Sequence, residues 1–264
     1  MNHVLHRSGS FLDFRVSCLA ALLLLMSATV RLPAAASDTV VLLHGLGRGP
    51  LSLKRLEVAL CDQGYVVRNV GYPSRSADIA TLAEATLGPI FREAAAANPH
   101  DHSASSAPTA TPRIHLVTHS LGGILVRQYL HDHGVPAALG RVVMLAPPNE
   151  GSEIVDRLRG WKLYQWINGP AGLQLGTDEA SVPRTLGPLP PGVEVGVIAG
   201  DRTLNPLLSS LLSGADDGKV TVAASHIAGE ADHLTLHATH TWIMLRGDTV
   251  AQVGAFLRDG RFAR

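Results

Sequence analysis

Residues 118–123, Thr-His-Ser-Leu-Gly-Gly, carry the side chain best suited to covalent chemistry. They follow the apolar run 114–117 and precede a stretch with helical periodicity at 124–131. A serine hydroxyl is a weak nucleophile, and it gains reactivity when a tight strand-to-helix turn projects it toward a histidine. We therefore interpret Ser120 as the candidate nucleophile of an acyl-transfer reaction. The turn departs from the pattern G-x-S-x-G, because Thr118 replaces the leading glycine.

Such a reaction needs three further parts: a histidine base, an acid that orients it, and backbone N–H groups for the developing oxyanion. The candidate acids are Asp201, which ends an apolar run, and Asp217, which lies in an Asp-Gly turn. The candidate bases are His233, His237 and His240. All of them follow the serine in the order acid, then histidine, so chain order alone leaves the choice open.

The elements that would position these residues alternate along the chain. Strands are expected at 39–43, 65–70, 114–117, 141–146 and 193–199, with a short one at 233–237. Helices are expected at 79–97, at 124–131, between 248 and 260, and from Leu53 to a stop at Gly64. This alternation predicts one α/β domain over residues 37–264, with a mostly parallel sheet and helices on both faces.

Two segments interrupt the pattern. Residues 98–112 are rich in Ala, Ser, Thr, His and Pro, which predicts a flexible surface insertion within the domain. Residues 147–192 lack strand periodicity and follow a core strand, so we expect a cap region over a pocket there. Its aromatic residues, Trp161, Tyr164 and Trp166, either contact substrate or anchor the connection to the core.

The first 36 residues have the features of an export signal. Arg7 and Arg15 flank a polar start, residues 16–30 are largely apolar, and small residues occupy 34–36. A membrane anchor is the alternative, but this apolar stretch is shorter than the roughly 20 residues that span a bilayer. The sequence therefore predicts a cleaved signal peptide and a periplasmic or secreted protein.

The charge and cysteine content limit the partners. Lys plus Arg and Asp plus Glu are equal at 22 each, so no overall field would attract nucleic acid or an acidic membrane. No further long apolar stretch follows residue 37, so no stable membrane insertion is expected after signal removal. Cys61 is the only cysteine beyond the signal, and we expect it to be a small core residue at a helix end.

The run 41–47, Val-Leu-Leu-His-Gly-Leu-Gly, together with 118–123 resembles the bacterial lipase and esterase branch of the α/β-hydrolase superfamily. The resemblance extends from about residue 39 to the end of the chain. It implies the α/β-hydrolase fold with a small cap, and hydrolysis of carboxylic esters of small molecules or lipids without a cofactor. In that family the residues after His-Gly and after the nucleophile donate backbone N–H groups to the oxyanion, which assigns this role to Leu46 and Leu121.

The same resemblance ranks the acids and bases. Asp217 matches the Asp-Gly-x-Val turn that carries the acid in bacterial lipases, and Asp201 is the alternative because it ends an expected strand. His240 precedes the terminal helix, where the family places its base, and His233 is the alternative base. The family gives the two motif histidines, His44 and His119, structural or pocket-lining roles.

The same residues admit rival functions. An acyltransferase would use the same acyl-enzyme, and a non-catalytic binding protein could retain the fold. A metal site at Asp232, His233, His237 and His240 is disfavoured, because H-E-x-x-H is absent and a strand would direct His237 and His240 to different faces. Neither G-x-x-x-x-G-K-[ST] nor a strand-linked G-x-G-x-x-G occurs, so no nucleotide cofactor is expected.

Overall fold

The computed structural model describes residue 1 and residues 37–97 and 112–264. The expected signal peptide at 1–36, apart from Met1, and the expected insertion at 98–112, apart from residue 112, lie outside the described residues. The described residues from 37 onward belong to one compact unit, Ala36–Arg264.

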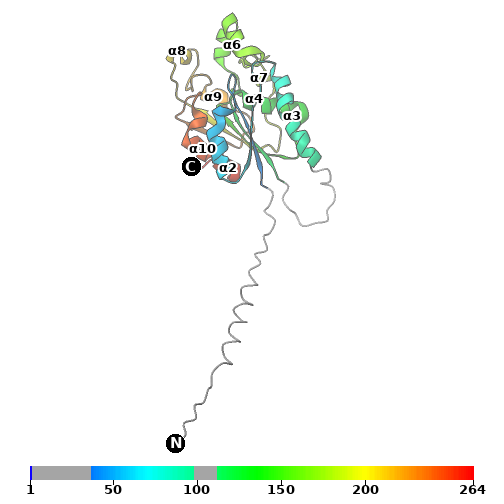
Figure 1. Cartoon of the computed structure of the whole chain (residues 1–264). Helices are drawn as coiled ribbons and strands as arrows, with labels where there is room; N and C mark the ends of the chain where they lie inside the picture. Colours follow the sequence, from blue (N-terminus) through cyan, green and yellow to red (C-terminus); the bar gives the residue numbers. More distant parts are fainter. Residues whose placement is uncertain (2–36, 98–111) are drawn as a thin grey trace. The chain divides into compact units, whose positions relative to one another are not determined.

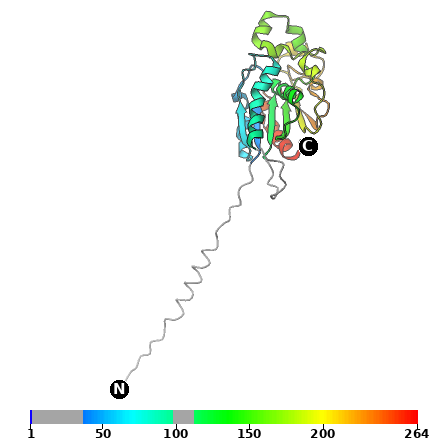
Figure 2. The same ribbon diagram turned by 90° about the vertical axis from the view of Figure 1, so that its right-hand side faces the viewer.

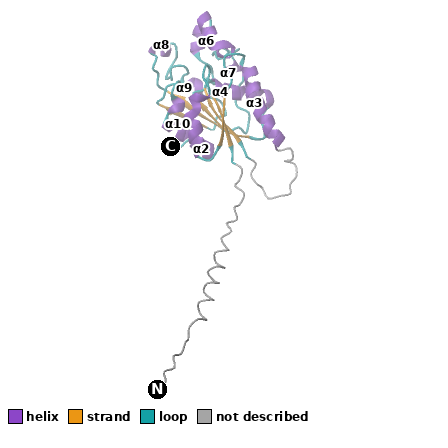
Figure 3. Ribbon diagram, in the orientation of Figure 1, coloured by secondary structure: helices purple, strands orange, loops and turns teal. Residues whose placement is uncertain are grey.

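A single parallel sheet forms the centre of this unit, as the alternation of strands and helices predicts (Figure 3). Its strand order is β2-β1-β3-β4-β5-β6. The strands are β1 (Thr39–Leu43), β2 (Val66–Val70), β3 (Ile114–His119), β4 (Leu139–Leu145), β5 (Val195–Gly200) and β6 (Asp232–Leu236). All the expected strands form. Where an observed end of a strand differs from the expected one, the difference is one or two residues.

The order of the strands creates a switch point between β1 and β3. The chain passes from β1 outward to β2 and then crosses back to β3 on the other side of β1. Leu43 pairs with Thr118 at the carboxyl ends of the two strands, so the loops that follow them emerge side by side. Open parallel sheets bind ligands in the crevice at such a point.

Helices cover both faces of the sheet (Figures 1 and 2). One face packs against α3 (Ile79–Ala97) and α4 (Leu121–His133), and the other against α2 (Lys54–Asp62) and α10 (Gly247–Asp259). Side chains alternate between the two cores along each strand: in β1, Val41 and Leu43 enter the first core, and Val40 and Leu42 the second. The remaining short helices are η1 (Pro50–Leu53), α8 (Pro206–Ser209), α9 (Val222–Ser225) and η2 (Ile243–Leu245).

The segment 147–192, where a cap was expected, contains α5 (Glu153–Leu158), α6 (Lys162–Leu173) and α7 (Val182–Thr185), joined by turns. The helix α6 is broken at Gly169, whose φ of 64° is accessible to glycine without strain. A Cβ atom at Gly169 would lie 2.1 Å from the carbonyl oxygen of Arg75, so the break lets the cap approach the loop after β2 closely. In Figure 1, α6 projects beyond the edge of the sheet.

Cys61 lies near the end of α2, as expected, but the expectation that it is a core residue is wrong, because it is exposed. Leu56 and Leu60 occupy the buried face of α2, and the next residue is turned about 100° away from Leu60 around the helix axis. Within the ranges that the structure describes, no helix is long and apolar enough to cross a bilayer.

Candidate active site

Ser120 lies in a strained turn between β3 and α4. Its φ of 52° and ψ of −121° are unusual for a residue with a side chain. The turn is held from both sides, because the Ser120 amide donates to the Leu145 carbonyl at 2.8 Å and the Gly123 amide donates to the Ser120 carbonyl at 2.9 Å. Hydrogen bonds of this kind fix the backbone so that the hydroxyl is presented at the carboxyl end of the sheet.

The packing around this turn accounts for Thr118. A Cβ at Gly122 would lie 2.7 Å from the Leu43 carbonyl oxygen, so only glycine permits this approach of helix to strand. Thr118 is fully buried, and its hydroxyl lies 3.5 Å from the carbonyl oxygen of Val143. A Cβ at Gly123 would lie 3.3 Å from that same hydroxyl. Because Gly123 has no side chain, there is space beside it for Thr118, which is larger than the glycine of the usual motif.

His240 and Asp217 meet Ser120 in one hydrogen-bonded chain. His240 Nε2 lies 3.0 Å from Ser120 Oγ, and His240 Nδ1 lies 2.8 Å from Asp217 Oδ2. Asp217 is 3% exposed and His240 5%, so solvent hardly competes for either bond. In the tautomer with a proton on Nδ1, the imidazole donates to the carboxylate and accepts from the serine hydroxyl.

The loop between β5 and β6 holds Asp217 firmly. Its Oδ1 accepts from the amides of Lys219 at 2.9 Å and Val220 at 2.8 Å, which leaves Oδ2 for His240. The main chains are also joined, because the His240 amide donates to the Asp217 carbonyl at 2.9 Å. Acid and histidine are thus fixed to each other through backbone and side chain.

The alternative acid and the alternative bases lie elsewhere. Asp201 pairs at 2.9 Å with His237, whose side chain is 72% exposed, and the structure does not bring either of them to Ser120. His233 bonds to the hydroxyl of Ser225 at 3.0 Å. Geometry therefore separates candidates that the sequence left open.

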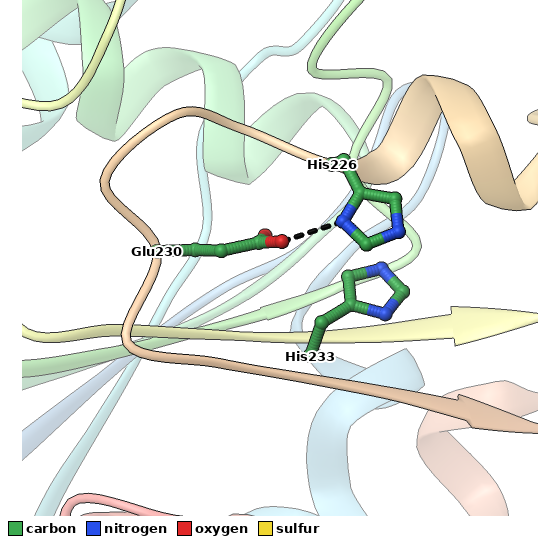
Figure 4. A group of neighbouring side chains, drawn as sticks. All are labelled: His226, Glu230 and His233. Carbon is green, nitrogen blue, oxygen red and sulfur yellow. Dashed lines mark hydrogen bonds and ion pairs between the residues drawn. The ribbon is translucent and has the colours of Figure 1, made fainter.

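The histidines of the disfavoured metal set do not converge, but a different group does (Figure 4). His226, Glu230 and His233 have potential ligand atoms within 4.8 Å of one another. His226 Nδ1 already bonds Glu230 at 2.5 Å, and the two imidazoles stack with centroids 3.7 Å apart and planes 17° apart. The nitrogen lone pairs of the two stacked imidazoles lie in nearly parallel planes. One ring would have to rotate before both His226 and His233 could bind the same ion.

The loop after β1, which contains Leu46, lies beside Ser120. His44 stacks on Tyr72 at 4.2 Å, accepts at Nε2 from the Tyr72 amide, and donates from Nδ1 to the Gly45 carbonyl at 2.9 Å. Burial lowers the pKa of His44, in keeping with this neutral form. Because the peptide unit is planar and trans, the Leu46 N–H points away from the Gly45 carbonyl and hence from His44. A Cβ at Gly45 would lie 3.1 Å from the Ser120 Cβ, so this loop abuts the nucleophile.

His119 makes a contact across the site that the sequence alone does not specify. Its Nε2 donates to the carbonyl oxygen of His240 at 2.9 Å, and its ring lies 4.9 Å from the His240 ring. Complete burial, together with the charge that His240 can carry, holds the pKa of His119 well below its usual value. His119 is therefore a neutral hydrogen-bond donor that links β3 to the loop that contains His240. The only sequence signal for His119 was its position between an expected strand and Ser120.

A cavity of about 310 Å³ opens over Ser120 and His240. Leu46 lines it beside them, and of the three cap aromatics only Tyr164 does so. Trp161 and Trp166 are 66% and 80% exposed, so they neither anchor the cap nor reach the cavity. Most of the wall is aliphatic, from Ile154, Val155, Leu158, Ile167, Leu175 and Val220.

No protein-family model matches the sequence, and no curated protein matches it either. Solved structures do resemble it. The mature form of lipase BlEst2 from Bacillus licheniformis is 19% identical, with a TM-score of 0.62 over 87% of this chain and 94% of its own. Phospholipase PlaB from Legionella pneumophila is 20% identical, with a TM-score of 0.56 over 72% of this chain and 45% of its own.

A metagenomic carboxyl esterase, MGS0156, is 20% identical, with a TM-score of 0.55 over 80% of this chain and 66% of its own. At these identities the likeness concerns the fold. It confirms the α/β-hydrolase fold that the two glycine-containing motifs indicate.

Proposed function

On an α/β-hydrolase fold, we propose that this protein is a serine hydrolase that cleaves carboxylic esters through an acyl-enzyme. One observation carries the proposal: the chain from Asp217 Oδ2 to His240 Nδ1 at 2.8 Å and from His240 Nε2 to Ser120 Oγ at 3.0 Å. It ends at the floor of an apolar cavity. A nucleophile, a base and an orienting acid within hydrogen-bond reach are the parts that acyl transfer by serine requires.

In the first half of the reaction, Ser120 Oγ attacks the ester carbonyl carbon while His240 Nε2 takes the hydroxyl proton. The resulting imidazolium is stabilised by Asp217, which keeps its negative charge. His240 then gives the proton to the departing alkoxide, and the C–O bond breaks to leave an acyl group on Ser120. In the second half, His240 removes a proton from water, water attacks the acyl carbon, and the acid leaves as Ser120 regains its proton.

The amides of Leu46 and Leu121 are the proposed donors to the oxyanion. Leu121 begins α4, so its N–H is one of the unpaired donors at a helix start and carries the favourable end of the helix dipole. Leu46 lies on the loop that abuts Ser120, with its N–H directed away from His44. Donors fixed in advance stabilise the charge without reorganisation.

The aliphatic wall supports an ester with an apolar acyl chain, in a small molecule or a lipid. The structural relatives are named as a lipase, a phospholipase and a carboxyl esterase, which agrees with this substrate class. No step of the proposed reaction needs a cofactor. We further propose that residues 1–36 export the protein to the periplasm or beyond, and that residues 147–192 cap the pocket.

A fluorophosphonate probe tests the nucleophile directly. We expect it to label folded protein at Ser120, and Ser120→Ala to lose both labelling and the cleavage of p-nitrophenyl butyrate. Ester cleavage that survives Ser120→Ala would contradict the proposal and favour a binding protein. Product analysis with added alcohols separates hydrolysis from acyl transfer, since an acyltransferase would form the new ester in preference to the free acid.

A further inference from the structure

Among the residues that the structure describes, two cations line the catalytic cavity and no carboxylate does. Arg48, two residues after Leu46, and Lys219, two residues after Asp217, stand among the cavity residues with Ser120. The protein as a whole has equal numbers of basic and acidic residues, so this excess of positive charge is local. A cleft lined by one sign of charge and apolar walls concentrates ligands of the opposite sign.

Neither cation has a protein partner in the part of the chain that the structure describes. The side chains of Arg48 and Lys219 make no hydrogen bond or ion pair there. Within residues 147–192, Arg159 contacts Asp178 at 2.6 Å and Arg184 contacts Glu150. Arg48 and Lys219 take no part in these ion pairs.

The carboxylate next to them is already engaged. Asp217 attracts Lys219 electrostatically, but both of its oxygens are taken up by His240 and by two backbone amides. Loss of solvent and the neighbouring charge of Arg48 lower the pKa of Lys219. The charges of Arg48 and Lys219 would both attract an anion that entered the cavity.

Both cations share the cavity with the proposed catalytic residues, since Arg48 and Lys219 line it together with Ser120 and His240. A ligand anion bound at these cations would thus lie near the reacting ester, on the same side of the cavity as the oxyanion loop and the acid loop. The aliphatic wall is formed separately, mainly by α5 and α6.

We propose that Arg48 and Lys219 form an anion subsite, so that the preferred substrate is an amphiphilic carboxylic ester bearing a phosphate or carboxylate group. The inference rests on the proposed ester hydrolase function and narrows its substrate class. The apolar part of the substrate packs against the aliphatic wall, and its anionic group binds between the two cations. The same chemistry is offered by the headgroup of an acidic phospholipid and by a soluble acidic ester.

A matched pair of soluble esters tests the subsite. Mono-p-nitrophenyl glutarate and p-nitrophenyl pentanoate share the leaving group and differ in a terminal carboxylate. The measured quantity is the ratio of kcat/KM for the anionic ester to kcat/KM for the neutral one. Vesicles of phosphatidylglycerol and of phosphatidylcholine give the corresponding ratio for lipids.

We expect each of Arg48→Gln and Lys219→Gln to lower the anionic-to-neutral ratio by about tenfold, which corresponds to about 1.4 kcal/mol. Lys219→Glu should invert the preference. Lys162→Gln removes the same charge from an exposed cap residue that does not line the cavity, and it should leave the ratio unchanged. Salt should reduce the wild-type ratio, because it screens charges at a partly open site.

The two substrate pairs distinguish the sources of the anion. A variant effect in the vesicle pair alone assigns a lipid headgroup, and an effect in the glutarate pair alone assigns a soluble acidic ester. A ratio that is unchanged by both substitutions in both pairs, or lowered equally by Lys162→Gln, would overturn the subsite. In that case Ser120-dependent cleavage of p-nitrophenyl pentanoate would still stand, whereas its absence in wild type would reject the proposed hydrolase itself.

Discussion

Nε2 of His119 donates a hydrogen bond of 2.9 Å to the backbone carbonyl of His240, so the residue before the nucleophile holds the residue proposed as its base. His119 ends β3 and His240 lies on the loop after β6, and these two strands lie on either side of β4 and β5 in the sheet. This bond acts across the active site and not along the chain. It makes His119 a positioning residue.

Removal of this bond should weaken catalysis by displacing His240. We expect His119→Phe to lower kcat about tenfold or more with a smaller change in KM, because misplacement of a catalytic group costs rate more than binding. His119→Gln, which keeps a side-chain donor, should recover part of the loss. A loss of stability without a fall in kcat of the folded protein would instead assign His119 to packing alone.

The fit between Thr118 and Gly123 predicts coupled substitutions. Gly123→Ala should lower the free energy of unfolding by about 1–3 kcal/mol, because the new Cβ would crowd the buried Thr118 hydroxyl. In Thr118→Gly the same change should cost less, giving an interaction energy of about 1 kcal/mol in a double-mutant cycle. Chemical denaturation of the four proteins measures it, and strict additivity would contradict this account of Thr118.

The choice between the two acids predicts unequal losses. Asp217→Asn should reduce kcat by about 10³–10⁴-fold, because it removes the charge that orients and stabilises His240. Asp201→Asn is the matched control, since its exposed partner is His237, and it should change kcat less than about twofold. Ester kinetics on both variants provide the comparison, and a larger loss from Asp201→Asn would reject the assignment.

The pKa of His233 predicts an acid-dependent loss of stability. Loss of solvent, with the charge of His226 as a smaller cause, lowers the pKa of His233 to about 4. Between the usual value of about 6.5 and 4, the unfolded chain binds a proton that the folded protein does not, so stability falls as the pH decreases through this window and levels off below it. His233→Gln should flatten the pH dependence of Tm, with His237→Gln as the exposed control. Parallel profiles for wild type and His233→Gln would show that this group is not responsible.

The sequence by itself determined the elements and their local chemistry. Period-two and helical patterns are set by which side of each segment is buried, so the six strands and the main helices were predictable from neighbouring residues. The turn at Ser120 and the His-Gly loop after β1 are also local, because glycine positions and short spacing define them. Cys61 shows the limit of such patterns, because it is exposed although its neighbour on the helix, Leu60, is buried.

Only the tertiary structure decided which distant groups meet. Asp201 and Asp217 are both acids after β5, and three candidate bases follow them, but the path of the β5–β6 loop brings Asp217 to His240 and leaves Asp201 with His237. The packing of Thr118 beside Gly123, the bond from His119 to the His240 carbonyl, and the presence of Arg48 and Lys219 in the lining of one cavity are likewise relationships that no local pattern specifies. The periodicity of a segment reflects only which of its own side chains are buried. These relationships depend instead on how the ends of six strands align at one edge of the sheet.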